Sequence, residues 1–186
     1  MLNIARAPRS CAELSDGREV TVRPVVADDA DATQAFVSGM SAHSRYLRFH
    51  VGLVHLPEVV LHQFTDVDQR TTVALVAQAE CEEHGSRGTA IVADARYVVD
   101  EDGASAEFAI AIDDEWQGAG LGRQLLTQLA AHARSQGIGM LYGDILWGNE
   151  RMLRLVRSVG AKMRRIEAGV LRAQISVESL VTARAN

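Results

Sequence analysis

Three glycines within five residues join an apolar, strand-like segment to an amphipathic helix. The joint reads Asp-Asp-Glu-Trp-Gln-Gly-Ala-Gly-Leu-Gly-Arg over residues 113–123. The first turn of a helix carries unpaired backbone N–H groups and a partial positive charge, and glycine lets an anion reach them without meeting a Cβ atom. The joint therefore predicts a strand that ends at a phosphate-binding turn and continues as a helix.

The spacing of these glycines excludes two common phosphate loops. A dinucleotide fingerprint reads Gly-x-Gly-x-x-Gly, whereas Gly118, Gly120 and Gly122 place the third glycine one residue early. A nucleoside-triphosphate loop ends in Gly-Lys followed by Ser or Thr, and the chain contains no such sequence. The pattern that does occur is Gln-x-x-Gly-x-Gly, formed by Gln117, Gly120 and Gly122.

The composition is that of an ordinary globular chain. Its 186 residues suit one domain with a sizeable core, and 47% hydrophobic with 23% charged residues lies near the average for folded proteins. The formal net charge of -5 argues against general nucleic-acid binding, which needs a cationic surface. We therefore expect no nucleic-acid partner.

The sequence carries no recognisable targeting, membrane or metal signal. Residues 1–8 contain no apolar signal-peptide core, and no segment approaches the ~18 apolar residues of a membrane span. Cys11 and Cys81 lie far apart, and the six histidines form no paired ligand pattern. We predict free thiols, a cytoplasmic location, no membrane partner and no metal.

Hydrophobic periodicity predicts a chain of alternating strands and helices. Residues 1–17 lack periodicity and are expected to form a loose lead-in, before a single domain over residues 18–186. The expected strands cover residues 18–25, 72–78, 88–99, 104–112, 140–147, 162–167 and 170–178. The expected helices begin at Asp28 or Asp29, at Ser41 or Ser44, near Pro57, at residue 120, and at Asn149 or Glu150.

The links between the predicted strands indicate the type of sheet. The turns at residues 82–87 and 100–103 are short and polar, so the strands that they join form an antiparallel meander, since parallel neighbours need a long crossover. The glycine joint therefore follows a meander. The expected fold class is α+β (an α/β three-layer arrangement), with a mixed, mostly antiparallel central sheet flanked by helices.

The chain resembles the GNAT N-acetyltransferase superfamily over residues 18–178. The resemblance rests on the order of the elements, on the Gln-x-x-Gly-x-Gly joint and on Asn149 at the start of the penultimate helix. In that family the phosphates belong to acetyl-CoA, a co-substrate that lies between two splayed strands. The resemblance implies that CoA is bound by Ile110, Ala111, Ile112, Gln117, Gly118, Ala119, Gly120, Leu121, Gly122, Arg123, Asn149 and Met152.

Glu107 is the candidate catalytic residue. It interrupts an apolar strand, and alternation places it on the same face as Ala109 and Ala111, whose small side chains leave space for a ligand. Poor solvation would raise its pKa and suit it to accept a proton from an amine. A solvent-facing or ion-paired residue is the alternative. The resemblance favours catalysis, because bacterial protein lysine acetyltransferases of this superfamily carry a catalytic glutamate at this point.

Val156 departs from the family pattern. Many GNAT enzymes have a tyrosine there, seven residues after the asparagine, which protonates the departing CoA thiolate. Here the proton comes from water or from another residue such as Tyr142, or no side-chain acid is used. A thiol with a pKa of ~8.5 is a tolerable leaving group near neutral pH.

Arginines recur at three-residue spacing in the penultimate helix, at positions 151, 154 and 157. Such a stripe could meet the 3′-phosphate of CoA. Such a series of charged residues is more often a helix face exposed to solvent, and we favour this interpretation.

The sequence leads to an acetyl-CoA-dependent N-acetyltransferase that moves an acetyl group directly to a primary amine. Residues 41–49 resemble the acceptor-side region of bacterial protein lysine acetyltransferases, which points to a protein lysine as the acceptor. A small amine such as an aminoglycoside, a polyamine or an amino acid is the alternative. A CoA-binding regulatory module without catalysis is a third reading, and a homodimer is left open.

Overall fold

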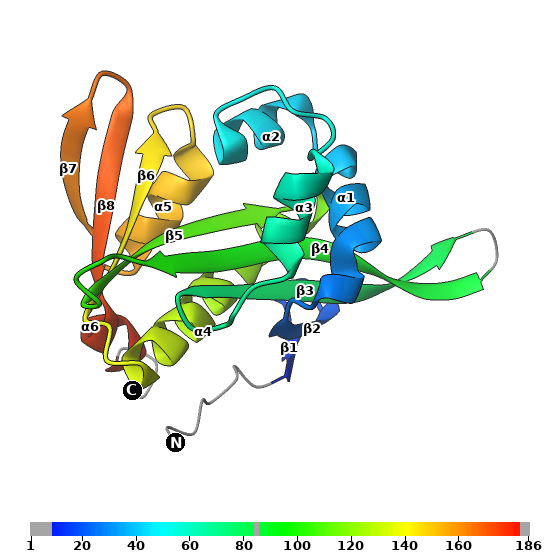
Figure 1. The fold of residues 1–186 in the computed structure, drawn as a ribbon, viewed down its shortest axis with the longest axis horizontal. Coiled ribbons are helices and arrows are strands. Elements are labelled where there is room, and N and C mark those ends of the chain that lie inside the picture. Colours follow the sequence, from blue (N-terminus) through cyan, green and yellow to red (C-terminus); the bar gives the residue numbers. More distant parts are fainter. Residues whose placement is uncertain (1–8, 84–85, 183–186) are drawn as a thin grey trace.

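The computed structural model describes residues 9–83 and 86–182, which form one sheet with helices on both faces (Figure 1). Within these residues the sheet has eight strands in the order β1-β2-β3-β4-β5-β6-β8-β7. Neighbouring strands are antiparallel except for the parallel pair β5 and β6. The predicted α+β fold with a mixed, mostly antiparallel sheet is confirmed.

The elements follow the predicted order. The strands are β1 (Ser10–Glu13), β2 (Glu19–Pro24), β3 (Thr72–Glu83), β4 (Ser86–Val99), β5 (Ser105–Ile112), β6 (Met140–Leu146), β7 (Lys162–Glu167) and β8 (Val170–Ser176). The α-helices are α1 (Ala30–Gly39), α2 (Ala42–Phe49), α3 (Glu58–Thr65), α4 (Leu121–Ser135), α5 (Glu150–Ser158) and α6 (Val177–Thr182). Of two short 3-10 helices, η1 (Ala27–Asp29) precedes α1, and η2 (Asp114–Trp116) lies within the glycine joint.

Two stretches at the ends of the chain differ from the prediction. The sequence predicts a loose lead-in over residues 1–17, of which 1–8 lie outside the described residues, but Ser10–Glu13 pair with β2 as strand β1. Four residues are too few for alternation to signal a strand. The last predicted strand, 170–178, ends at Ser176, and α6 follows and packs against α4.

The third difference concerns the hairpin between β3 and β4. The predicted turn at residues 82–87 is shorter in the structure, because β3 extends to Glu83 and β4 begins at Ser86. Residues 84–85 lie outside the described residues. Cross-strand pairing thus extends the strands beyond the apolar runs from which their ends were predicted.

Two apolar cores lie on opposite faces of the sheet. On one face α4 packs through fully buried leucines such as Leu125 and Leu129, as their four-residue spacing predicts. On the other face Phe36 and Val37 of α1 pack near Ala111 of β5. Full burial of each large apolar side chain contributes about 1.5–3 kcal/mol, so these two layers hold β5 firmly in place.

Strands β5 and β6 pair only at their first residues. The parallel register joins Ser105 to Met140, Ala106 to Leu141 and Glu107 to Tyr142. Beyond these pairs β5 continues to Ile112 and β6 to Leu146, so the strands diverge. The divergence opens the sheet beside the glycine joint, and α2 contacts β5 near this opening.

Candidate active site

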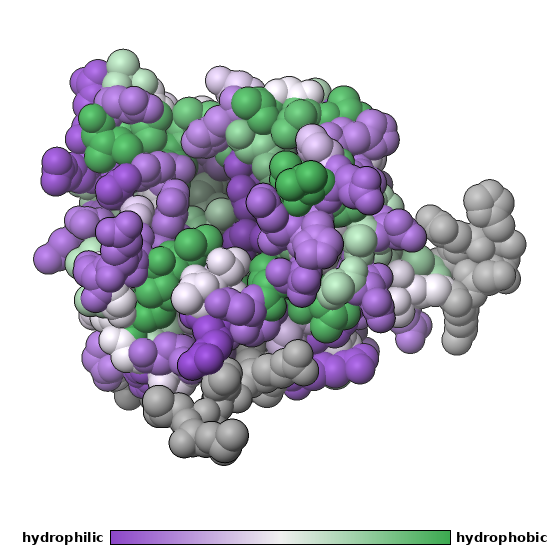
Figure 2. Space-filling view, viewed as in Figure 1, coloured by the Kyte–Doolittle hydropathy of each residue, from purple (hydrophilic) through white to green (hydrophobic). Residues whose placement is uncertain are grey.

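A cavity of about 670 Å³, the larger of two adjoining cavities, lies where β5 and β6 diverge. Figure 2 shows a hollow between the part of the surface formed by β6–β8 and the part formed by α1–α3. The walls come from α2, the end of β5, the glycine joint and the start of α5. Among the predicted cofactor-binding residues it is lined by Ile110, Ala111, Ile112, Gln117, Gly118, Gly120, Gly122, Arg123, Asn149 and Met152.

Two predicted cofactor-binding residues do not line the larger cavity. Ala119 and Leu121 are buried, with 5% and 1% of their surface exposed, and both belong to the core on the α4 side. Their side chains anchor the joint in the core. Only their backbone atoms remain for a ligand.

The glycine joint has the backbone shape that glycine permits. Gly118 and Gly120 have φ of 87° and 90°, in the left-handed region that glycine adopts without strain, and Gly120 is the N-cap of α4. A Cβ atom on Gly122 would lie 3.1 Å from the side chain of Leu155 and 3.3 Å from that of Ile112. The joint thus brings the N-terminus of α4 against α5 and β5 at the cavity wall, where an anion is favoured.

Gln117 links the joint to its neighbours on both sides. Its Nε2 donates to the carbonyl oxygen of Ile112 over 2.8 Å, and its Oε1 accepts from Nη1 of Arg151 on α5. Arg123 on α4 donates from Nη2 to the carbonyl and hydroxyl oxygens of Ser158, each over 3.0 Å. Gln117 therefore holds the end of β5 and the start of α5 on either side of the joint.

The arginine stripe of α5 is divided between cavity and solvent. Arg151 and Arg154 line the larger cavity, although both are exposed, whereas Arg157 is exposed away from it. The sequence favoured a solvated face for all three. Their three-residue spacing signalled a shared face, but only the packing of α5 shows which members flank the cavity.

Asn149 begins α5 as its N-cap. Its Oδ1 accepts from the backbone N–H of Met152 over 3.1 Å, which satisfies one of the unpaired donors at the helix start. The N–H donors of the same amide remain available, and Asn149 lines the larger cavity. Asn149 thus lies at the wall of the larger cavity, and its contact with the cofactor stays a prediction.

A smaller cavity of about 230 Å³ adjoins the first. The residues common to both are Leu47, Arg48, Ile110, Asn149 and Met152. The smaller cavity contains Glu107 and Asp144, which the larger one lacks. A ligand in one cavity would therefore meet a ligand in the other near the end of α2.

Glu107 lies on the predicted face of β5. Phe108 and Ile110 are buried in the core on the α4 side, whereas Ala111 belongs to the opposite core, so alternation places Glu107 with Ala111. Much of the Glu107 side chain is exposed, yet the cavity walls partly desolvate its carboxylate. This burial raises its pKa, and the charge of Asp144 adds to the increase.

Charged residues from three further elements surround Glu107. Asp144 of β6 accepts two hydrogen bonds of 2.7 Å from Arg172 of β8. Arg172 also opposes the rise in the pKa of Glu107, whereas Asp100, after β4, adds to it. Arg48 of α2 opposes it as well. Two negative and two positive side chains therefore act on the Glu107 carboxylate.

Val156, which replaces the family's tyrosine, and Tyr142, the alternative proton donor, line neither cavity. Val156 is fully buried in the α4-side core and cannot donate a proton. The Tyr142 hydroxyl donates to Asp100 over 2.9 Å, and burial together with that contact raises its pKa to about 12. Tyr142 lines neither cavity, so no side chain at these positions is arranged to protonate a leaving group.

The N-terminus of α2 is held beside the larger cavity by Asp114. This carboxylate accepts from the backbone N–H and hydroxyl of Ser41, over 2.9 and 3.1 Å, and from the hydroxyl of Ser44 over 2.6 Å. The Ser41 hydroxyl also caps α2 by accepting from the N–H of Ser44. Sequence reasoning missed this link, although the serines three residues apart were a signal for a helix start.

Three further predictions concern metal sites, membrane-spanning helices and the two cysteines. Within the described residues, no group of three or more His, Cys, Asp or Glu is placed to hold a metal ion. Over the same part of the chain, the helices are too short or too polar to cross a bilayer. Cys11 and Cys81 are both free thiols.

Residues 19–162 match the protein family described as acetyltransferase (GNAT) domain. Acetyltransferase PA5475 of Pseudomonas aeruginosa is 28% identical over 171 residues, which cover 86% of this chain and 90% of that protein. Acetyltransferase Pat of Mycolicibacterium smegmatis is 27% identical over 172 residues, which cover 91% of this chain and 49% of Pat. The solved GNAT domain of S. lividans PAT has a TM-score of 0.80 and 29% identity, covering 90% of this chain and 96% of that domain.

Proposed function

The chain belongs to the acetyltransferase (GNAT) domain family and is an acetyltransferase that uses acetyl-CoA, and from this premise we propose that its acceptor is the ε-amine of a protein lysine. The observation that carries the proposal is the Glu107 carboxylate in the smaller cavity, which adjoins the larger one. About 230 Å³ can admit the four methylenes and the amine of lysine, whereas an aminoglycoside of several rings would extend far outside it.

We assign the larger cavity to acetyl-CoA. The pyrophosphate lies at the N-terminus of α4, against Gly118 and Gly120, where the backbone leaves room for an anion. Arg123 and Arg151 add positive charge at the same wall. The pantetheine arm runs along the diverging edge of β5 and reaches Asn149.

Bound acetyl-CoA supplies an acetyl thioester, whose carbonyl carbon gains the amine nitrogen as its bond to sulfur breaks. Glu107 accepts the proton that the amine loses, directly or through one water. Backbone N–H groups near Ile112 stabilise the negative charge that develops on the carbonyl oxygen. The CoA thiolate leaves and takes a proton from water, since Val156 and Tyr142 do not reach it.

Two resemblances support a protein acceptor over a small amine. Residues 41–49, the region similar to bacterial protein lysine acetyltransferases, are α2 and its N-cap Ser41, and α2 contributes Leu47 and Arg48 to the smaller cavity. Glu107 occupies the position of their catalytic glutamate. The acceptor assignment therefore rests on the residues that line the smaller cavity.

The test compares acceptors in one assay. The purified chain is mixed with acetyl-CoA and either lysine-rich proteins, amino acids, polyamines or aminoglycosides, and both thiol release and the acetylated atoms are measured. We expect enzyme-dependent acetylation of lysine ε-amines, above the background of a reaction without enzyme. Acceleration with small amines alone would overturn the lysine assignment.

A binding control accompanies this assay. Acetyl-CoA, but not NADH or ATP, should raise the thermal unfolding midpoint, because selective binding to the folded state at ~100 times Kd stabilises by about 2.7 kcal/mol. No shift at saturating acetyl-CoA would contradict the assignment of the larger cavity. The two measurements together separate a wrong acceptor from a wrong donor site.

A further inference from the structure

Arg48 places a buried positive charge at the junction of the two cavities. Only 14% of its side chain is exposed, and it lines both cavities from the last turn of α2. Its Nε makes no hydrogen bond within the described part of the chain. Burial lowers the pKa of Arg48 to about 10, which still leaves the guanidinium charged at neutral pH.

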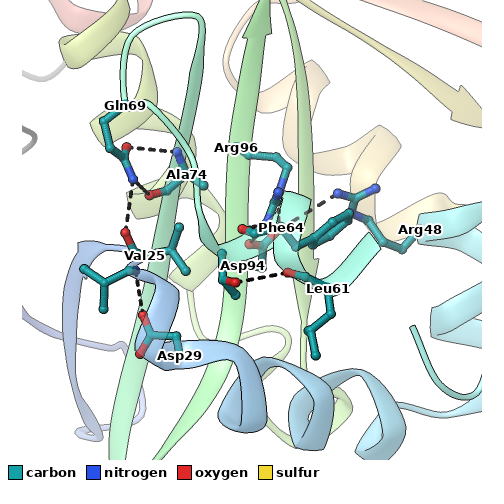
Figure 3. A network of polar contacts seen from close by, with 11 residues as sticks. Val25, Asp29, Arg48, Leu61, Phe64, Gln69, Ala74, Asp94 and Arg96 are labelled. Carbon is teal, nitrogen blue, oxygen red and sulfur yellow. Dashed lines mark hydrogen bonds and ion pairs between the residues drawn. The ribbon is translucent and has the colours of Figure 1, made fainter. Parts of the chain in front are cut away.

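The charge of Arg48 is only partly compensated by its nearest carboxylate. Figure 3 shows Arg48 directed at Asp94, whose Oδ1 lies 3.9 Å from Nη2 of Arg48. Asp94 is held more closely by Arg96, which donates to it over 2.9 and 2.5 Å. The rings of Phe49 and Phe64 lie 5.0 and 5.7 Å from the Arg48 guanidinium. Arg48 thus shares Asp94 with Arg96, and Glu107 is a second, weaker carboxylate partner of its charge.

The pairing of β4 and β5 places Glu107 on the sheet face that α2 covers. Asp94, Arg96 and Val98 of β4 lie opposite Ala111, Ala109 and Glu107 of β5. Alternate residues of a strand share one face, so Glu107 and the two alanines line the face that carries Asp94 and Arg96. The alanines leave room above β5, and Arg48 and Glu107 both line the smaller cavity.

Three other charged residues act on Glu107. Asp144 of β6 raises its pKa, and Arg172 of β8, which is paired with Asp144, lowers it more than Arg48 does. Asp100 adds a second negative charge and is bonded by Tyr142, which brings no positive charge. Arg48 is therefore the second positive charge that acts on Glu107, against the two carboxylates of Asp144 and Asp100.

We propose that Arg48 is a positioning residue that keeps the carboxylate of Glu107 ionised in the smaller cavity. The inference rests on the proposed role of Glu107 and deepens it, because it names the charge that keeps the base ready to accept a proton. Arg48 belongs to α2, so the ionisation of a residue on β5 depends on the placement of a helix that Asp114 anchors.

The test is a direct titration of Glu107 by carboxyl carbon NMR, with its signal assigned by its loss in Glu107→Gln. We expect the titration midpoint in Arg48→Met to lie higher than in the wild type, by up to about one pH unit, since a nearby opposite charge lowers a carboxyl pKa. Arg48→Lys keeps the charge and should restore most of the difference. Arg70→Met removes the same charge from an exposed residue outside both cavities and should leave the midpoint unchanged.

An unchanged Glu107 midpoint in folded Arg48→Met overturns the proposal. Folding is checked by the thermal shift with acetyl-CoA, and Arg48→Gln, which keeps polar donors, is titrated in its place if the methionine variant does not fold. The titration needs no acceptor. A shifted midpoint together with full activity of Glu107→Gln would therefore support Arg48 while removing Glu107 as the base of the proposed function.

Discussion

The larger and the smaller cavity adjoin, but different parts of the chain build them. The larger cavity takes much of its wall from the continuous run of the β5 end and the glycine joint, with α5 closing it. The smaller cavity draws its charged residues from α2, β5 and β6, and their partners from β4 and β8. The larger cavity thus depends on backbone shape, and the smaller one on side chains brought from distant segments.

This difference indicates where specificity can change. Backbone N–H groups and glycines suit a ligand that never varies, such as the pyrophosphate of CoA. Side-chain charges such as Glu107, Asp144 and Arg48 can be exchanged singly while β5 keeps its two supporting cores. We therefore expect substitutions in the smaller cavity to alter the acceptor or the rate without abolishing acetyl-CoA binding.

The largest effect is expected from Glu107→Gln. Loss of a general base should lower kcat/KM for the amine by about 10²- to 10⁴-fold. The Kd for acetyl-CoA should stay unchanged, because Glu107 does not line the larger cavity. Steady-state kinetics and calorimetry measure the two quantities, and Glu80→Gln, an exposed carboxylate on β3, is the matched control. Unchanged kcat/KM would remove the smaller cavity from the chemistry.

A structural effect is expected at Gly143, which lines the smaller cavity where β6 passes Phe108 of β5. A Cβ atom on Gly143 would lie 3.0 Å from the carbonyl oxygen and from a ring carbon of Phe108. Gly143→Ala should lower the free energy of unfolding by about 1–3 kcal/mol, since β5 cannot move away from its cores without strain. Denaturant unfolding measures this against Gly139→Ala, where the nearest atom, the Ala104 oxygen, is 3.9 Å away. Equal stability of both variants would show that the strands part easily.

A smaller effect is expected where Asp114 connects the joint to α2. Asp114→Ala removes the acceptor of three hydrogen bonds from Ser41 and Ser44. Because Asp114 is exposed, the loss in unfolding free energy should be about 1 kcal/mol, and Asp114→Asn should lose less. The KM for the amine should rise, since α2 carries Arg48. An unchanged amine KM would show that α2 keeps its place without this link.

The pH dependence of Asp114 follows from its partners. Burial alone would raise its pKa, but the hydrogen bonds from Ser44 and Ser41 outweigh burial and lower it. A lowered folded-state pKa contributes stability that is present at neutral pH and is lost as the pH falls below ~4. The stability difference between wild type and Asp114→Ala should therefore shrink in acid.

The smallest expected effect is the pH-dependent loss of folding stability that ionised Glu107 causes. Its folded-state pKa is raised above the unfolded value, mainly by burial, so folding favours the protonated form. Its unfavourable contribution is absent below an ordinary glutamate pKa of ~4.3 and grows as the pH rises through the folded-state value. The difference in thermal unfolding midpoint between Glu107→Gln and the wild type should therefore favour the variant more at pH 7 than at acid pH. The same difference at both pH values would contradict the raised pKa.

Local sequence rules were sufficient for most elements and for the glycine turn beside the larger cavity. The four-residue spacing of Leu121, Leu125 and Leu129 predicted α4, and all three are buried. The glycine spacing predicted the turn into α4, where Gly118 and Gly120 have positive φ. These features involve neighbours in the chain, so their signal lies within a short window of sequence.

Features that depend on partners far along the chain were missed. The four residues of β1 carry too short an alternation, and their strand exists because β2 offers a pairing edge. The anchoring of Ser41 by Asp114 joins positions 73 residues apart. Arg48 and Asp94 meet only because α2 folds over the sheet.

The sequence by itself determined the order of the elements from β2 to β8, the glycine turn before α4, the face on which Glu107 lies and the absence of a tyrosine at Val156. Tertiary structure alone decided that Val156 is buried in the core, that Tyr142 is hydrogen-bonded to Asp100, and that Arg48 and Glu107 line the same cavity. The physical reason is the range of the forces. Backbone preferences and periodicity act between near neighbours, whereas desolvation and charge depend on every group that packing brings within a few ångströms.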